Sequence, residues 1–372
     1  MSLPAAIDIV IVNYRCTGDT LGALAALGPW PHGTIWLVDN SVDCDEAATL
    51  EAATVGRNDV RLLIAEENLG FARGCNRAFD LSSAPHLLLL NPDARIGAVQ
   101  VIRLAEALAN NPQWGALSPK IFWDEERRFL IPEAFPQSPA VAIAAVLASH
   151  APRLAHLAFR RYLRRTQQRM AGTELFATPF LAGSVLMLRR DAALRAGGLF
   201  DPDYFMFYED TDLSLRLRRA GFRIGIAPQV EAVHEYRHKP FKIPLMVQSR
   251  QIYFHKRFPR FFVATRKMTR IDRLARPVCW TRWGEVLTEP LGSAAEFTDR
   301  TAGAGIVAFS PTPLMMPAIM RPAHALPAQL NDKDWDRLEA GRYMAAIGSA
   351  TGALRMVSFE RAPRLTAIPG VR

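Results

Sequence analysis

Three apolar runs of strand length, each ending in polar residues, constrain the fold of this chain more than any other feature. In chain order they are IDIVIVNY, TIWLVDNSVD and HLLLLNPDA, and segments of helical character separate them. The four leucines of the third run are too few to span a membrane and are typical of a strand covered on both faces. The alternation of strands and helices predicts an α/β fold with a parallel, doubly wound sheet.

Polar side chains follow each of these runs. Asn13 and Asp39 end the first two runs, and Asn91 and Asp93 flank a proline after the third. Ligands bind at the carboxyl ends of strands in open α/β sheets, so a carboxylate on a rigid Asn-Pro-Asp turn is well placed to hold a metal or a sugar. The alternative is that Asn91 and Asp93 only shape a turn. In either case we expect these side chains to cluster at one sheet edge.

Composition narrows the class of protein. The 372 residues, 49% of them hydrophobic and 22% charged, suffice for one large α/β domain and a smaller unit. No segment approaches eighteen apolar residues, and the N-terminus lacks a signal-peptide pattern, so we expect a cytoplasmic protein. The cysteines have neither metal-binding nor disulfide spacing. We expect reduced thiols at Cys16, Cys44, Cys75 and Cys279.

The net charge of +9 favours an anionic partner. Six arginines and no acid lie between Arg153 and Arg169, and the apolar stretch PAVAIAAVLAS comes just before them. Such a segment either lies on an anionic membrane surface or forms a solvated basic helix. Membrane contact would make the protein peripheral at the inner face of the cell membrane. No helix-turn-helix, zinc-finger or RNA-binding signature is present, so nucleic acid is not expected as a partner.

The character of the sequence changes beyond residue 265, where proline and glycine become frequent and periodicity weakens. We predict one domain over 1–265, with a basic and apolar helical insertion at 125–172. Residues 266–372 are expected to form a small C-terminal appendage with few clear elements. The segment GALRMVSFERAP is the exception, since its pattern indicates a short β unit.

Six segments together resemble family 2 glycosyltransferases of the GT-A fold, in particular bacterial rhamnosyltransferase-like enzymes of cell-surface polysaccharide synthesis. They are IVIVNY, WLVDNSVDCD, NLGFARGCNRA, LLLLNPDA, LAGSVLMLRRDAALRAGGLFD and FYEDTDLSLRLRRAGFRI. The resemblance covers most of residues 5–260 and omits the arginine-rich insertion and the C-terminal region. It implies a Rossmann-like mixed sheet flanked by helices.

The resemblance implies a nucleotide-sugar site at the predicted sheet edge. In the family, the first strand end and the acid of VDN hold base and ribose, and the NLGFARGCNRA segment lies beside the donor, where glycine allows close approach. The alternatives are a turn or helix N-cap role for the acid and a plain loop-to-helix turn for the glycines. The residues implied are Asn13, Tyr14, Asp39, Asn68, Gly70, Phe71, Ala72, Asn76 and Asn91.

The Asn-Pro-Asp turn corresponds in this resemblance to the family's Asp-x-Asp metal motif, with Asn91 in place of the first acid. It implies that Asp93 binds Mg²⁺ or Mn²⁺, and a divalent cation there stabilises the departing nucleoside diphosphate. His234 follows the last strand, where many relatives have a histidine near the metal or phosphates. The alternative for His234 is a core or surface histidine.

An inverting sugar transfer needs a base that takes the proton of the acceptor hydroxyl. The resemblance implies Asp210 as this base and Glu209 as a group that contacts the acceptor or orients the base. The alternative is that both acids complement the dipole of the helix DLSLRLRRAGF. The resemblance also aligns Ala182, Gly183 and Ser184 with the turn that lines the acceptor side.

The expected function is metal-dependent, inverting transfer of a sugar from a nucleotide-sugar donor to a hydroxyl of a glycan or lipid-linked glycan. dTDP-rhamnose is a candidate donor. Two alternatives are a non-catalytic nucleotide-sugar-binding relative and a nucleotidyltransferase that makes the activated sugar. The segment IVIVNYRCTGDT lacks the glycine-rich triphosphate loop that the nucleotidyltransferase would need.

Overall fold

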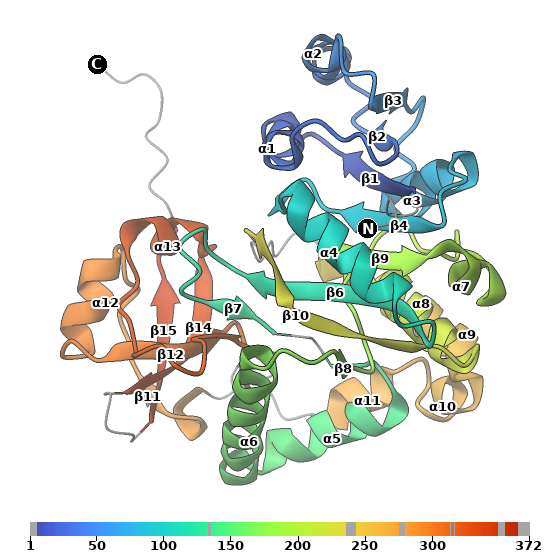
Figure 1. Ribbon diagram of the computed structural model, residues 1–372. Coiled ribbons are helices and arrows are strands. Elements are labelled where there is room, and N and C mark those ends of the chain that lie inside the picture. Colours follow the sequence, from blue (N-terminus) through green and yellow to red (C-terminus); the bar gives the residue numbers. More distant parts are fainter. Residues whose placement is uncertain are drawn as a thin grey trace.

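The N-terminal part of the chain builds the parallel half of one sheet (Figure 1). The computed structural model describes residues 6–132, 135–235, 243–274, 280–312, 314–315, 317–348 and 354–363. Four parallel strands lie in the order β3-β2-β1-β4, and every residue of β1 and β4 is buried. Their bounds are β1 (Ile7–Asn13), β2 (Ile35–Asp39), β3 (Val60–Ile64) and β4 (His86–Leu90). The parallel α/β arrangement predicted for this part of the chain is confirmed.

Helices connect these strands. Their bounds are α1 (Thr17–Leu27), α2 (Cys44–Thr54), α3 (Gly70–Leu81) and α4 (Ala98–Ala109). The Asp43 carboxylate caps α2 by accepting hydrogen bonds from the backbone N–H groups of Asp45 and Glu46. The buried face of α3 consists of small residues and Phe79, which allows this helix to lie close to the sheet.

Antiparallel strands make the sheet mixed. Strand β9 lies between β4 and β6 and is antiparallel to both, while β10 runs parallel to β6 and forms short antiparallel pairs with β5 and β8. The bounds are β5 (Ala94–Arg95), β6 (Trp114–Phe122), β8 (Phe176–Ala177), β9 (Val185–Arg189), β10 (Arg223–His234), α7 (Arg190–Arg195) and α8 (Glu209–Arg219). A mixed sheet flanked by helices is the architecture predicted for a GT-A protein.

The 125–172 segment contains a short strand and two helices. The two helices lie at the lower end of the molecule in Figure 1. Their bounds are β7 (Leu130–Ile131), α5 (Pro139–His150) and α6 (Pro152–Ala171). Helix α6 buries one face, with buried residues recurring every three or four positions from Ala155 to Met170. Helix α5 has no buried residue.

Helices α9, α10 and α11 follow the last core strand and cover the same end of the molecule (Figure 1). Their bounds are α9 (Ile243–Arg257), α10 (Pro259–Ala264) and α11 (Thr269–Leu274). Helix α11 packs on α5, and the His150 ring nitrogen Nε2 lies 2.9 Å from the carbonyl oxygen of Leu274. Among the described helices, none has the length and apolar character that a membrane span requires.

The region beyond residue 265 has more regular structure than its composition indicates. Strands β12, β14 and β15 form an antiparallel unit, and β13 pairs with β7, so one sheet continues from the N-terminal strands into this unit. The β unit expected near GALRMVSFERAP is present as β15. The bounds are η2 (Trp280–Arg282), β11 (Glu285–Val286), α12 (Ala294–Arg300), β12 (Gly305–Ser310), β13 (Ile319–Met320), α13 (Asp332–Arg337), β14 (Gly341–Gly348) and β15 (Arg355–Arg361).

The apolar core of the C-terminal unit includes residues from the first half of the chain. Trp123 and Phe129 belong to the same cluster as Phe309 and Trp335, and the rings of Trp123 and Phe309 lie 5.2 Å apart. The partners are far apart in sequence, which is why local periodicity within the C-terminal region did not reveal the unit. The thiols of Cys16, Cys44 and Cys75 are free, as expected, and Cys279 lies outside the described residues.

Candidate functional site

Asn13 and Asp39 meet at the carboxyl edge of β1 and β2, where they are register partners. The Asn13 amide Nδ2 donates to Asp39 Oδ1 at 2.9 Å and to Ser41 Oγ at 3.0 Å, and Asn13 Oδ1 accepts from the Thr20 hydroxyl at 2.7 Å. Asn13 is therefore occupied by internal hydrogen bonds. Asp39 is buried, and its second oxygen, Oδ2, has no partner among the residues described. A buried acceptor without a partner points to a ligand that donates a hydrogen bond to it.

Tyr14 follows β1 and is 46% exposed. The next residue, Arg15, has a φ of 51°, and its backbone N–H donates to Ser41 Oγ at 2.9 Å. This sharp turn holds the Tyr14 ring outside the core, with the Arg15 guanidinium 5.9 Å from the ring centroid. An exposed aromatic face beside Asp39 can stack on a planar base.

Gly70 begins α3 at a close approach between two backbone segments. Its φ is +73°, and the Asn68 side chain accepts its N–H at 3.0 Å. The Phe71 N–H donates to the Phe205 carbonyl at 2.8 Å, and a Cβ on Gly70 would lie 2.4 Å from that oxygen. Glycine is required at this position because the Phe205 segment lies against it. The sequence pattern did not indicate this contact within the protein.

Asn76 and Ala72 face inward from α3. The Asn76 amide donates to the Phe200 carbonyl at 2.8 Å and accepts from the Phe200 N–H at 3.0 Å, and Ala72 is fully buried. Asn76 therefore fastens the segment that leads to the two acids of α8. The Asn76 amide is used by its bonds to Phe200, and Ala72 has no polar side-chain atom. Neither side chain therefore offers a free polar atom to the edge formed by Asn13 and Asp39. Asn40, which sequence reasoning missed, also anchors this loop by donating to the Gly70 carbonyl at 2.9 Å.

The Asn-Pro-Asp turn lies against the end of β10. The Asp93 carboxylate oxygen Oδ1 is 3.1 Å from the His234 ring nitrogen Nε2, and the Glu235 N–H donates to the Asp93 carbonyl at 3.0 Å. The Asn91 N–H donates to the Ser184 carbonyl at 2.8 Å. The structure thus brings Asp93 and His234 together, and it joins the turn to the predicted acceptor-side segment.

The Asp93 and His234 pair suits a divalent cation that a substrate helps to bind. Carboxylate oxygen and imidazole nitrogen are both used by Mn²⁺, and neighbouring ligands of an octahedral ion with bonds of about 2.1 Å lie roughly 3.0 Å apart. The described residues contain no group of three or more His, Cys, Asp or Glu side chains arranged around one metal position. Such an ion would therefore depend on phosphate oxygens and water for its other ligands.

Glu209 and Asp210 open α8 in different surroundings. Asp210 Oδ2 accepts from the Gly183 N–H at 3.1 Å, and its Oδ1 accepts from the Thr211 N–H at 2.6 Å. Glu209 is buried, and its oxygen Oε2 has no hydrogen-bond partner in the described structure. Burial raises the pKa of both carboxyl groups; the charge of Asp210 raises that of Glu209 further, while hydrogen bonds from Gly183 and Thr211 oppose the increase at Asp210.

The backbone before α8 is strained. Phe207 and Tyr208 have φ values of 70° and 67°, a region that costs a non-glycine residue roughly 1 kcal/mol or more. Helix α9 holds this conformation, because Ser249 Oγ donates to the Met206 carbonyl at 2.7 Å and the Tyr208 and Tyr253 rings lie 5.6 Å apart. The strain places the two acids at the first turn of α8 while the aromatic residues pack behind them.

Gly183 lies between the donor loop and the predicted base. A Cβ at Gly183 would lie 3.5 Å from the Phe71 ring and 3.7 Å from the Asp210 Cβ. Gly183 and Ser184 are buried and Ala182 is exposed. The Gly183 N–H donates to Asp210 and the Ser184 carbonyl accepts from the Asn91 N–H, so two consecutive residues connect Asp210 to the turn that carries Asp93.

Arg257 is a supporting residue that sequence reasoning missed. Its Nη2 donates to the buried Asp212 at 2.9 Å, and the Nε of Arg216 donates to the same carboxylate at 2.6 Å. Asp212 therefore joins α9 to α8. Asp212 and Arg257 are 45 positions apart, so no local pattern could have paired them.

Comparisons with known proteins identify the family of this chain. Residues 4–254 match the glycosyltransferase-like family 2. The chain is 30% identical over 224 residues to the N-acetylglucosaminyl-diphospho-decaprenol L-rhamnosyltransferase of Mycobacterium tuberculosis. This alignment covers 57% of this chain and 69% of that protein. It is 44% identical over 57 residues to the rhamnosyltransferase WbbL of Escherichia coli, covering 15% of this chain and 21% of that one.

Among solved structures, a mannosyltransferase from Pyrobaculum calidifontis in complex with GDP-Man and Mn²⁺ aligns with 73% of this chain and 70% of its own, at 16% identity and a TM-score of 0.48. The family match extends from the first strand into α9 and includes every residue of the site described above except Arg257. The chain therefore belongs to the glycosyltransferase-like family 2, and it is a glycosyltransferase of the rhamnosyltransferase-like kind.

Proposed function

We propose that this protein transfers a sugar, with inversion, from a nucleoside diphosphate donor to a hydroxyl of a lipid-linked glycan. The observation that carries the proposal is the link from Asp210 through Gly183 and Ser184 to Asn91, because it places a carboxylate of raised pKa beside a turn suited to a diphosphate and its metal. The names of the relatives support dTDP-rhamnose as first candidate donor and a polyprenyl-diphosphate-linked N-acetylglucosamine as first candidate acceptor.

Asp210 is proposed to take the proton from the attacking hydroxyl. The raised pKa of this carboxyl group increases its affinity for the proton, and the N–H groups of Gly183 and Thr211 fix its orientation. Burial and the charge of Asp210 raise the pKa of Glu209 beside it well above the ordinary value. Its oxygen Oε2 has no hydrogen-bond partner in the described structure and is proposed to contact the acceptor.

Asp93 and His234 are proposed to hold Mg²⁺ or Mn²⁺ on the donor side. A divalent cation there would neutralise charge on the departing nucleoside diphosphate. The free oxygen of Asp39 and the exposed ring of Tyr14 are proposed to hold the ribose and base. These assignments divide the sheet edge into a nucleotide end at β1 and β2 and a phosphate end at β4 and β10.

A lipid-linked acceptor would place the enzyme at a membrane surface. We therefore propose that the protein works peripherally at the inner face of the cell membrane, where the lipid carrier and a nucleotide-sugar pool are both accessible.

The test is release of nucleoside diphosphate from a panel of dTDP-, UDP- and GDP-sugars, with lipid-linked N-acetylglucosamine in detergent and with Mn²⁺ or EDTA. We expect metal-dependent turnover of one donor, a loss of at least 100-fold in Asp210→Asn, and little change in the matched control Asp191→Asn, an exposed acid at the start of α7. Donor binding without turnover with any acceptor would instead indicate a non-catalytic relative, and pyrophosphate formation from a nucleoside triphosphate would indicate a nucleotidyltransferase.

A further inference from the structure

Helix α5 is apolar and has no buried residue, which is unusual for a helix of a water-soluble domain. Ile143 and Leu147 on this helix are 46% and 64% exposed. After the bend at Ala151, helix α6 adds Leu154 and Leu157, which are 68% and 47% exposed. Four large aliphatic side chains therefore face solvent on two consecutive helices. Neighbouring exposed apolar side chains of this kind mark an interaction surface.

Helix α6 also carries a concentration of positive charge. The sequence has no acidic residue between Phe135 and Thr173, whereas the α6 arginines Arg160, Arg161, Arg164 and Arg165 are all exposed. None of these four forms an ion pair with a carboxylate of the described chain. An apolar strip next to arginines that lack a carboxylate partner is complementary to an anionic bilayer. Such a bilayer offers acyl chains and phosphate groups at neighbouring depths.

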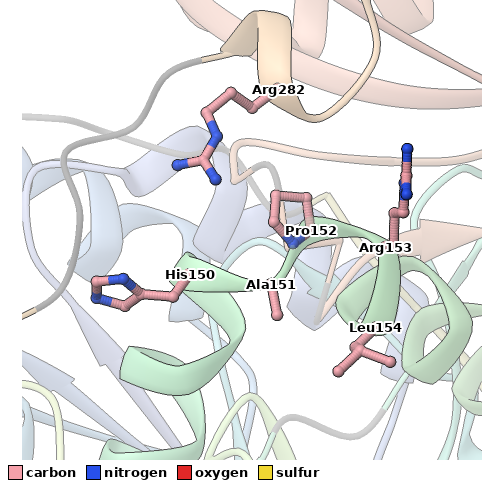
Figure 2. Close-up of a pocket in the computed structure, with 6 residues that line it drawn as sticks. All are labelled: His150, Ala151, Pro152, Arg153, Leu154 and Arg282. Atoms are coloured by element: carbon pink, nitrogen blue, oxygen red, sulfur yellow. The ribbon is translucent and has the colours of Figure 1, made fainter.

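The junction of α5 and α6 contains a hollow with basic walls (Figure 2). Figure 2 shows Arg282 of η2 reaching toward the junction, with Pro152 between it and Arg153. The guanidinium groups of Arg153 and Arg282 have no carboxylate partner within the described parts of the chain. These two groups add positive charge at the junction of the two helices.

A second hollow lies between the start of α5 and the first turn of α8. Its lining includes Ser138 at the start of α5, Tyr253 of α9, and Thr211, which directly follows Asp210. The Tyr253 hydroxyl donates to the Gln137 carbonyl at 2.9 Å and so fixes the start of α5 against α9. The start of α5 is therefore close to the first turn of α8.

We propose that α5 and α6, which we call the α5–α6 elbow (Pro139–Ala171), dock the enzyme on an anionic membrane. Ile143, Leu147, Leu154 and Leu157 enter the headgroup and acyl boundary, and the arginines of α6 contact lipid phosphates. This inference rests on the proposed function for its purpose, because docking here would present a lipid-linked acceptor to Asp210.

The test uses the full-length protein and sedimentation with vesicles of phosphatidylcholine, alone or mixed with phosphatidylglycerol. We expect binding to the mixed vesicles at low salt, weakening as salt is added, and little binding to phosphatidylcholine alone. Replacing Arg160, Arg161, Arg164 and Arg165 with Gln should weaken binding by about two orders of magnitude, and Ile143→Glu with Leu147→Glu should weaken it at least tenfold.

Matched controls lie on α2 and α4, away from the elbow. Val55→Glu with Val99→Glu changes two residues that are 81% and 61% exposed, and Arg103→Gln removes an exposed arginine. These variants should bind vesicles as the wild type does. All surface variants should keep the wild-type melting temperature, because the side chains they change are not buried.

The proposal is wrong if the wild type does not sediment with the anionic vesicles, or if the elbow variants bind them as tightly as the controls. It is also wrong if the aliphatic variants convert a dimer to a monomer in solution without changing vesicle binding, since the surface would then be a contact between two copies. Diphosphate release with the acceptor in detergent separates the two proposals: elbow variants should retain it, and Asp210→Asn should lose it while still binding vesicles.

Discussion

Arg337, in the last turn of α13, forms an ion pair with Glu235 at the end of β10, with 3.0 Å between Nη2 and Oε1. Glu235 also donates its backbone N–H to the Asp93 carbonyl and directly follows His234. Arg337 is buried, and the neighbouring Asp334 is held by a two-pronged pair with Arg128 at 2.7 Å. The C-terminal unit therefore contacts the segment that positions the proposed metal residues.

Removing the Arg337 side chain should loosen that segment. We expect Arg337→Ala to lower the free energy of unfolding by about 1–3 kcal/mol, because a partly buried charged hydrogen bond is lost. We also expect it to raise the Mn²⁺ concentration needed for half-maximal activity. The control is Arg342→Ala, whose pair with Glu360 at 2.6 Å is more exposed and should contribute less than about 1 kcal/mol. Equal effects of the two substitutions would argue against a special link to the metal residues.

The metal assignment predicts that Asp93→Asn and His234→Ala weaken Mn²⁺ binding in the presence of the nucleoside diphosphate. A loss of roughly tenfold or more is expected for each. Electron paramagnetic resonance of free Mn²⁺ measures this independently of turnover. If neither substitution changes the free Mn²⁺ signal, these two residues are not the ligands.

The raised pKa of Asp210 predicts how the rate of sugar transfer depends on pH in acidic solution. A base must be deprotonated to act, so the rate should fall as pH decreases through a pKa above the usual Asp value of about 4. The Thr211 hydroxyl, 3.3 Å from Asp210 Oδ1, lowers this pKa. Thr211→Val should therefore move the acid limb to higher pH. A profile that Thr211→Val leaves in place would contradict the assignment of that limb to Asp210.

Glu209 should make the stability of the protein depend on pH. Its pKa is higher in the folded chain than in the unfolded one, so the folded state binds more protons between these two values. Stability should accordingly fall as pH rises from the unfolded pKa through the folded pKa. Glu209→Gln, which cannot ionise, should flatten this dependence in thermal unfolding measured from acidic to alkaline pH. A slope identical to that of the wild type would show that Glu209 ionises freely when folded.

Gly70→Ala should destabilise the protein by at least about 1–2 kcal/mol, because the new Cβ would lie 2.4 Å from the Phe205 carbonyl and φ is +73°. Activity should fall as well, since Phe205 leads into the two acids of α8. Gly18→Ala is the matched control: it lies inside α1, nothing lies within 4 Å of its added Cβ, and it should be neutral or stabilising. Chemical denaturation of both variants measures the difference.

The strand ends and their polar residues could be predicted because burial and periodicity are local signals. The sequence therefore indicated that Asn13 and Asp39 end neighbouring strands, where the structure pairs them. The bond from Asn76 to Phe200 and the ion pairs of Asp212 with Arg257 and of Glu235 with Arg337 join segments far apart in the chain. A single sequence carries no pattern for such contacts, so the supporting residues emerged only from the structure.

The sequence did not indicate the C-terminal unit, for a related reason. Its strands β12 and β14 are rich in small residues, and the unit completes its core with Trp123 and Phe129 from the β6 to β7 region. The segment therefore lacks the long apolar pattern of a separately folded domain. Only β15 had a recognisable strand sequence.

The pairing of Met320 in β13 with Leu130 in β7 has a practical consequence for anyone who shortens this protein. Cutting the gene after residue 265, where composition changes, would remove the neighbour of β7 and uncover Trp123 and Phe129, which are nearly fully buried. An open strand edge beside newly exposed aromatic rings invites chains to join edge to edge. The shorter product would accumulate as aggregates, so the place where the sequence changes character is not a place where the molecule can be divided.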